Sequence, residues 1–328
     1  MLKQVQQVTK SQESSQEKPQ EKATDTEVTK TASVPSSADW TSLFARPSPP
    51  TLVRKPGKPV QFVKKTLNST PLYETIVDLN DADQYVTIAL ANDANQANTN
   101  GNSHGDEAFQ SLVRKSHAAV VLNGTFFSKD DEKRVMGNMV AGGRFLKYSR
   151  WENMGTTIGI RENNKLEMVT ARDAEKQPEW REHWFSITCG PRLLKKGEVW
   201  IEPEKEGFHN AHVLGIGPRV AMGFNVKGDK LILVVFVNGL SLQGEAELMK
   251  QLGCSDAMNL DGGASRAVAY NGKIIMPAGR PLTNVIEVYD IKHPAPAEVV
   301  QSWAAFQKGV RTSPPEAVAA HMNLPFKF

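Results

Sequence analysis

The stretch "NLDGGASR", from Asn259 to Arg266, places the carboxylate of Asp261 at the end of an apolar segment and directly before two glycines. Without side chains, Gly262 and Gly263 can adopt a positive φ and let a ligand approach the chain closely. Their N–H groups can bind oxygen atoms, as in other glycine-rich anion sites, and Ser265 adds a hydroxyl donor. Because Asp-Gly is also the commonest signal of a hairpin turn, the stretch alone is equally consistent with a plain turn.

Two further patterns combine a glycine with a polar side chain. In "VVLNGTFFS" (residues 120–128), Asn123 ends an apolar, β-branched segment and is followed by Gly124 and two phenylalanines. Alone, this pattern favours a strand that ends in a turn, with both rings in the core. Arg192 and Arg219 each follow a Gly-Pro pair. The proline stiffens the backbone, and a rigidly held guanidinium suits bidentate binding of phosphate or carboxylate, although most single arginines are solvated.

The composition is that of a globular protein, with 328 residues of which 40% are hydrophobic and 23% charged. A net charge of +3 argues against a nucleic-acid surface held by bulk charge. We find no apolar run of the roughly 18–20 residues that a membrane span needs, and residues 1–22 lack the apolar region of a secretory signal. Cys189 and Cys254 can form one disulfide or remain two buried thiols. The histidine spacings and the absence of nucleotide-binding motifs predict no metal and no cofactor.

The chain divides into three parts by composition. Residues 1–57 are polar and then proline-rich, which predicts a disordered or extended segment. Residues 58–292 contain many short apolar strands, including a predicted hairpin at 219–239 with Lys227-Gly228-Asp229 as its turn. Helices are predicted at 107–116 and 241–253, the second with Ser241 as its N-cap. Residues 293–328 are expected to form a peripheral tail with a short helix. We therefore predict a single catalytic domain of the α+β class, with a mixed, largely antiparallel sheet and a few packed helices.

Three segments in order, "VVLNGTFF", "GPRVAMGF" and "ELMKQLGCSDAMNLDGGASR", resemble the phosphodiester glycosidase family over roughly residues 58–292. Thr125 and Ala264 each replace a glycine of the usual family pattern. The resemblance implies a hydrolase that cleaves a sugar-1-phosphodiester or a related glycoside, with a carbohydrate or sugar phosphate as its partner. Members of the family are typically exported, so we expect an extracytoplasmic location. The N-terminal sequence does not support this, and a cytoplasmic location stays open.

The hypothesis for the site is that distant residues meet in one anion-binding cleft around Asp261. Asp261 would act as nucleophile or base, and Asn123 would bind sugar hydroxyls or orient Asp261. Asp256 would be a second acid/base group or a structural carboxylate. The substrate would be bound by two arginines, by glycine amides and by a hydroxyl, from Arg192, Arg219, Gly124, Gly262, Gly263 and Ser265. A phosphate leaving group is weakly basic, so it needs charge stabilisation more than protonation.

Two other classes of function fit the same residues. The first is a non-catalytic module that binds phosphoglycans or cell walls without turnover. The second is a metal-assisted phosphodiesterase that uses Asp256 and Asp261 as ligands.

Overall fold

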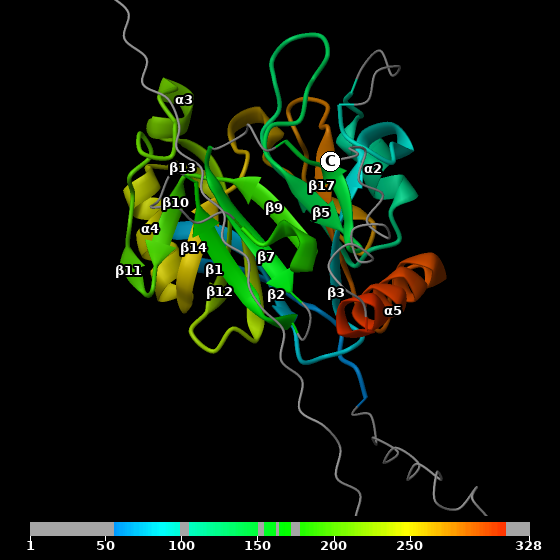
Figure 1. The fold of residues 1–328 in the computed structure, drawn as a ribbon. Coiled ribbons are helices and arrows are strands. Elements are labelled where there is room, and N and C mark those ends of the chain that lie inside the picture. Colours follow the sequence, from blue (N-terminus) through cyan, green and yellow to red (C-terminus); the bar gives the residue numbers. More distant parts are fainter. Residues whose placement is uncertain (1–55, 99–104, 150–153, 162–163, 172–177, 313–328) are drawn as a thin grey trace, which may run out of the picture. The chain divides into compact units, whose positions relative to one another are not determined.

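Every strand pairing between named strands in the described part of the chain is antiparallel, and these strands form three sheets (Figure 1). The computed structural model describes residues 56–98, 105–149, 154–161, 164–171 and 178–312. All of them belong to one compact unit, residues 55–328. The predicted α+β class with a largely antiparallel arrangement is confirmed. Of the two expected terminal segments, 1–55 and 313–328 lie outside the described residues.

The first sheet has seven strands and contains the predicted hairpin. Its order is β1 (Gln61–Leu67), β2 (Thr70–Asp78), β13 (Lys230–Leu240), β12 (Gly217–Asn225), β14 (Cys254–Asn259), β10 (Arg192–Lys195) and β11 (Glu198–Val199). Helix α4 (Leu242–Gln251) follows the hairpin β12–β13. The hydroxyl of Ser241 accepts a hydrogen bond from the N–H of Gly244 at 3.1 Å, which confirms Ser241 as the N-cap.

The other two sheets have five strands each. One has the order β16 (Lys273–Met276), β15 (Val268–Tyr270), β4 (Val120–Asn123), β17 (Asn284–Tyr289) and β3 (Tyr85–Leu90). The other has the order β6 (Arg144–Lys147), β5 (Met139–Ala141), β9 (His183–Cys189), β7 (Thr156–Arg161) and β8 (Leu166–Thr170). The described helices besides α4 are α2 (Phe109–Lys115), α3 (Ala211–Leu214), α5 (Ala297–Thr312), η1 (Ala91–Asp93), η3 (Trp180–Glu182) and η4 (Gly263–Ser265).

The largest apolar core lies between the sheets, because it draws buried side chains from all three of them. A second core joins the other face of the seven-stranded sheet to α4. A third joins the sheet of β4 and β17 to α2. Burial of apolar surface is the main favourable term in folding. Helix α5 is longer than the short helix expected for the tail, and its Trp303 contacts Trp184 with ring centroids 4.3 Å apart.

The described residues show the state of the two cysteines and the character of the helices. Cys189 and Cys254 are both buried and neither is bonded to the other, so they are the two buried thiols rather than a disulfide. None of the helices in the described ranges is long and apolar enough to cross a membrane.

The sheets are joined by chain crossings that meet at one place. The chain leaves the seven-stranded sheet at the end of β14, passes through η4 and enters the second sheet as β15. It leaves the third sheet at the end of β9 and enters the seven-stranded sheet as β10. The N–H of Gly190, between β9 and β10, donates to the carbonyl of Asn259 at 2.9 Å, which ties the two crossings together.

Candidate active site

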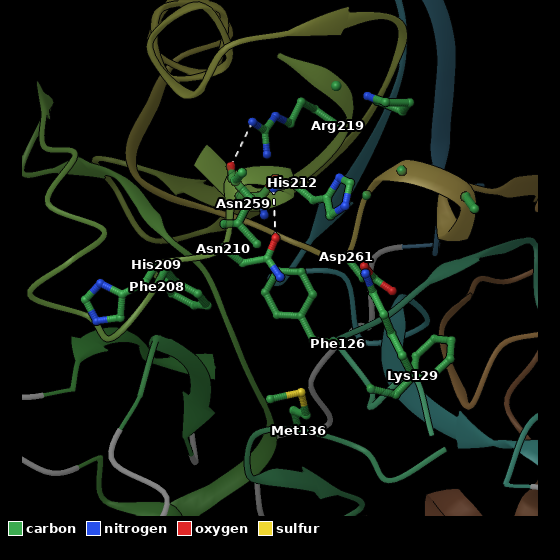
Figure 2. Close-up of a pocket in the computed structure, with 18 of the residues that line it drawn as sticks. Phe126, Lys129, Met136, Phe208, His209, Asn210, His212, Arg219, Asn259 and Asp261 are labelled. Atoms are coloured by element: carbon green, nitrogen blue, oxygen red, sulfur yellow. Dashed lines mark hydrogen bonds between the residues drawn. The ribbon is translucent and has the colours of Figure 1, made fainter. Parts of the chain in front are cut away.

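Asp261 lies at the first of these crossings, on the wall of a cavity of about 690 Å³ (Figure 2). Strand β14, an interior strand of the seven-stranded sheet, and the fully buried Leu260 lead to it. Its N–H donates to the carbonyl of Gly124 at 3.2 Å, just beyond the end of β4. Only 6% of the residue is exposed, so its carboxylate meets the cavity but is otherwise surrounded by protein.

The side-chain amide of Asn123 holds the loop that carries Asp261. Its Nδ2 donates to the carbonyl of Asp261 at 2.5 Å, and its Oδ1 accepts from the N–H of Ala267 at 3.0 Å. One buried amide therefore bonds both ends of the crossing from β14 to β15. Asn123 is 1% exposed and does not line the cavity. Of its two predicted roles, the structure favours orienting Asp261 over binding sugar hydroxyls.

Two of the three predicted glycines, Gly124 and Gly262, are required by the packing of the chain. A Cβ atom on Gly124 would lie 2.0 Å from Oδ1 of Asn284, and one on Gly262 would lie 2.2 Å from the carbonyl of Pro218. Gly263 has a φ of +57°, as predicted for a turn glycine. Gly262 and Gly263 line the cavity, whereas Gly124 does not. The prediction that Gly124 contacts substrate is therefore corrected.

Thr125 and Ala264, at the two positions where the family pattern has glycine, differ in their effect on the cavity. The buried hydroxyl of Thr125 donates to the carbonyl of Thr188 at 2.5 Å, and Thr125 does not line the cavity. Ala264 is exposed and lines it. Of these two substitutions, Ala264 is therefore the one that adds a methyl group to the cavity surface.

The guanidinium that faces Asp261 belongs to Arg280, which was not among the predicted site residues. Its Nη2 lies 3.0 Å from Oδ2 of Asp261, and its Nε donates to the hydroxyl of Ser265 at 2.7 Å. The guanidinium also lies 4.1 Å from the ring centroid of Phe127. Ser265 is fully buried and does not line the cavity. Its position therefore favours orienting Arg280 and Asp261 over the predicted contact with substrate. Arg280 stands next to a proline in Gly279-Arg280-Pro281, much as the predicted arginines do.

Burial raises the pKa of Asp261 to about 6, since the cavity wall removes water from the carboxylate. The hydrogen bond from Ser265 and the positive charge of Arg280 act in the opposite direction and keep the rise moderate. Asp261 is therefore mostly ionised at neutral pH, yet it lies close to the range in which a carboxyl group can exchange protons with a substrate.

Arg192 and Asp256 are not part of this site. Both are partners in a partly buried ion pair on the neighbouring strands β10 and β14, and neither lines the cavity. Arg192 also donates to the carbonyl of Leu194 at 2.9 Å and to the hydroxyl of Thr170 at 3.1 Å. This corrects the predicted cleft, in which Arg192 held substrate. Of the two roles predicted for Asp256, the ion pair favours that of a structural carboxylate.

Arg219 lines the cavity, but its guanidinium binds the protein backbone. Nε donates to the carbonyl of Leu240 at 3.1 Å, and Nη2 donates to those of Val213, at 3.0 Å, and Gly215. Nε also lies 3.8 Å from the carboxylate of the buried Glu245, whose pKa is raised to about 8 by burial. Arg219 therefore fixes the segment 213–217 at the rim of the cavity. This differs from the predicted direct contact with phosphate.

The remaining polar groups of the cavity come from loops. Lys129, His209 and His212 are exposed and line it, and Figure 2 shows Lys129 and His212 extending into the space in front of Asp261. Asn259 is buried, and its Nδ2 donates to the carbonyl of Gly190 at 2.8 Å. Its Oδ1 has no hydrogen-bond partner within the described residues. A buried acceptor without a partner on a cavity wall is suited to a ligand donor.

The described residues contain no group of three or more His, Cys, Asp or Glu side chains arranged to hold a metal ion. Of Asp256 and Asp261, the pair required for a metal-assisted phosphodiesterase, Asp256 is in an ion pair with Arg192 and does not line the cavity.

Comparison with known proteins identifies the family. A model of the phosphodiester glycosidase family matches residues 116–289, more than half of the chain. The chain therefore belongs to the phosphodiester glycosidase family, the name of which describes hydrolases of glycosidic bonds to phosphodiesters. It is 29% identical over 180 residues to the N-acetylglucosamine-1-phosphodiester alpha-N-acetylglucosaminidase of Bos taurus. That match covers 50% of this chain and 33% of the bovine protein, so the chain spans about a third of that relative.

Solved structures share the fold. The catalytic domain of the zebrafish enzyme of the same name, described as auto-inhibited by its pro-peptide, aligns with a TM-score of 0.54 and 21% identity, over 71% of this chain and 82% of that one. A hypothetical protein from Synechocystis aligns with a TM-score of 0.52 and 16% identity, over 70% of this chain and 62% of that one.

The Asn123 amide gives a first testable prediction. In Asn123→Ala the carbonyl of Asp261 and the N–H of Ala267 lose their partner while buried, so we expect the free energy of unfolding to fall by roughly 2–4 kcal/mol. Urea denaturation measures this. The control is Asn210→Ala, which removes one exposed hydrogen bond to the N–H of His212. Equal losses in the two variants would show that the amide does not hold the loop.

The raised pKa of Asp261 predicts a dependence of stability on pH. The pKa of Asp261 is about 6 in the folded state against an ordinary value of 3.8, so between these values the folded state binds more protons than the unfolded state. Stability is therefore lost as pH rises through this window. As pH rises from about 4 to about 7.5, the free energy of unfolding of Asp261→Asn should increase by about 2–3 kcal/mol relative to that of the wild type.

The measurement is urea denaturation at both pH values, with Asp229→Asn in the turn between β12 and β13 as the control. A difference between Asp261→Asn and wild type that does not change with pH would contradict the raised pKa.

Proposed function

We propose that the chain hydrolyses the bond between the anomeric carbon of a sugar and the phosphate of a sugar-1-phosphodiester. The observation that supports this most is the ionisable carboxylate of Asp261 on the cavity wall, 3.0 Å from a guanidinium nitrogen of Arg280. Membership of the family supports the class of bond. The name of the bovine relative makes N-acetylglucosamine the first sugar to test.

The reaction breaks the bond between C1 and the phosphate oxygen. Water supplies a hydroxyl group to C1, and the phosphate leaves as a monoester. Its leaving oxygen is already weakly basic, so protonation by a general acid contributes less than it does in an ordinary glycosidase. The larger requirements are to stabilise positive charge at C1 and to hold the negative charge of the phosphate.

Asp261 meets the first requirement. Its ionised carboxylate can stabilise the positive C1 centre, attack it as a nucleophile, or accept a proton from the attacking water as a base. Burial strengthens the field that the carboxylate exerts, because little water screens it. The amide of Asn123 fixes the backbone of Asp261, so the carboxylate does not have to reorganise during the reaction.

The second requirement falls to cationic groups on the same cavity. Nη1 of Arg280 donates no hydrogen bond to the described part of the chain, so it is open to a phosphate oxygen next to Asp261. Lys129 and the imidazole of His212 add donors from the facing loops. The unpartnered Oδ1 of Asn259 would accept a hydrogen bond from a sugar hydroxyl. Arg219 contributes by positioning the rim.

The extent and location of the enzyme complete the proposal. The catalytic domain would span residues 58–292, with residues 293–328 peripheral to it, and it would work outside the cytoplasm. The family resemblance supports that location.

Hydrolysis of the methyl diester of N-acetylglucosamine 1-phosphate in oxygen-18 water tests the proposal. We expect free N-acetylglucosamine with the label at C1, and at least about a 10³-fold lower rate for Asp261→Asn, since a neutral amide can neither attack C1 nor stabilise its positive charge. Asp229→Asn is the matched control and should keep the wild-type rate. Mass spectrometry of both products locates the label.

Each of the other possible results would indicate a different function. Label in the phosphate would indicate a phosphodiesterase, and saturable binding without release of sugar would indicate a binding module. An unchanged rate in Asp261→Asn would remove Asp261 from the chemistry.

Arg280 provides a second test through the pH profile. The rate at low substrate should rise with pH through about 6 as Asp261 ionises. Arg280→Gln removes the positive charge that lowers the pKa of Asp261. The rising limb of the pH–rate profile should therefore move to higher pH, and the rate should fall about 10²-fold. Arg280→Lys keeps the charge and should leave the limb nearer its wild-type position. A limb that stays in place in Arg280→Gln would show that Asp261 is not the titrating group.

A further inference from the structure

The cavity has an apolar part beside the polar surroundings of Asp261. Four large apolar side chains line it there, from Phe126, Met136, Met154 and Phe208. Figure 2 shows the ring of Phe126 between Asp261 and Met136, with Phe208 next to it. The rings of Phe126 and Phe208 meet edge to face with centroids 5.9 Å apart. We call these four side chains the apolar subsite.

The apolar subsite is built on firmly held backbone. The N–H of Met136 donates to the carbonyl of Phe126 at 2.8 Å, and Phe127 forms a β-bridge with Val135. Phe208 packs into space left by two glycines, since a Cβ on Gly155 or Gly190 would come within 3.0–3.3 Å of its ring. The apolar surface is therefore a fixed feature of the cavity wall.

Part of this surface stays in contact with solvent. Met136 is 39% exposed, and Phe126 and Met154 are half-buried. Exposed apolar surface is unfavourable in water, and its concentration in a cavity marks a binding site for an apolar group. Methionine side chains are flexible and polarisable, so they can adapt to chains of different shape.

The apolar subsite is poorly suited to recognise a second sugar. Of the polar side chains that line the same cavity, Asn210 has its oxygen occupied by the N–H of His212 at 2.9 Å. A bound sugar needs hydrogen-bond partners for most of its hydroxyl groups, because each unpaired group that is buried costs free energy. Two methionines and two phenylalanines offer no strong donors or acceptors.

The proposed substrate carries a second alcohol on its phosphate, and this group also needs a binding surface. A phosphodiester carries two alcohols, and only one of them is the sugar whose C1 faces Asp261. The cavity of about 690 Å³ is within the range of roughly 300–1,000 Å³ that accommodates molecules larger than one sugar. With the phosphate at Arg280, the second alcohol extends into the rest of the same cavity.

We infer that this second alcohol is an aliphatic chain, bound by Phe126, Met136, Met154 and Phe208. The inference rests on the proposed function, since it identifies the group on the far side of the phosphate. It makes the substrate an amphipathic sugar-1-phosphodiester, in which the enzyme separates a polar sugar from an alkyl phosphate.

Binding of a homologous series tests the inference separately from catalysis. The methyl, butyl and octyl diesters of N-acetylglucosamine 1-phosphate are titrated by calorimetry into Asp261→Asn, which does not turn them over, below the concentration at which the octyl diester forms micelles. Each methylene that becomes buried contributes about fourfold in affinity, so we expect the octyl diester to bind at least about tenfold more tightly than the methyl diester.

Variants locate the preference in the cavity. Adding Met136→Gln should reduce the ratio of octyl to methyl affinity to about threefold or less, because it places an amide where the chain would lie. Adding Val226→Gln, at an exposed position in the turn between β12 and β13, should leave the ratio unchanged.

The outcomes of the two experiments can be told apart. Equal affinities of the methyl and octyl diesters, or no binding of either, would overturn the inference. So would a preference that survives Met136→Gln. Cleavage of the methyl diester by the wild type tests the proposed function by itself, and its failure would not alter the affinity ratio measured here.

Discussion

The amide of Asn123 is the contact on which the site depends. It bonds the carbonyl of Asp261 and the N–H of Ala267, and so connects the end of β4 to both ends of the crossing from β14 to β15. Interior strands of two sheets are thereby tied together at one point. Asn259 and the N–H of Gly190 add the crossing from the third sheet. A carboxylate at such a junction can be partly exposed and still rigid, because the sheets fix its backbone.

Asp261 is balanced between two opposing effects. Burial favours the neutral acid, whereas Arg280 and Ser265 favour the carboxylate. The residue is thus ionised near neutrality at a cost in stability, which is common where a protein keeps a reactive group. Arg219 is a buried cation with a different task, because it binds carbonyls at the rim instead of a ligand. The apolar subsite and the Asp261 region face one cavity, so bond cleavage and recognition of the far alcohol would share a single substrate orientation.

Local patterns predicted much of the fold and part of the site. The N-cap at Ser241, the hairpin β12–β13 and the turn at Gly263 depend on neighbouring residues, and each was correctly predicted. Asp261 was placed in a cavity wall, as the glycine-rich turn suggested. The arginines could not be assigned this way, because their contacts depend on which strands pair. Arg192 forms an ion pair with Asp256 on the adjacent strand, and Arg280 was not predicted as a site residue. Strand β9 was missed because all its residues are buried, so its sequence shows no alternation.

The central claim is that the carboxylate of Asp261 faces the anomeric carbon of a bound sugar-1-phosphodiester. A crystal structure of Asp261→Asn with the methyl diester of N-acetylglucosamine 1-phosphate would test it most directly. We expect C1 of the sugar to lie against the side chain of residue 261, with a phosphate oxygen bound by Arg280. A complex with the phosphorus atom against residue 261 and C1 turned away, or with the diester outside the cavity, would contradict the account.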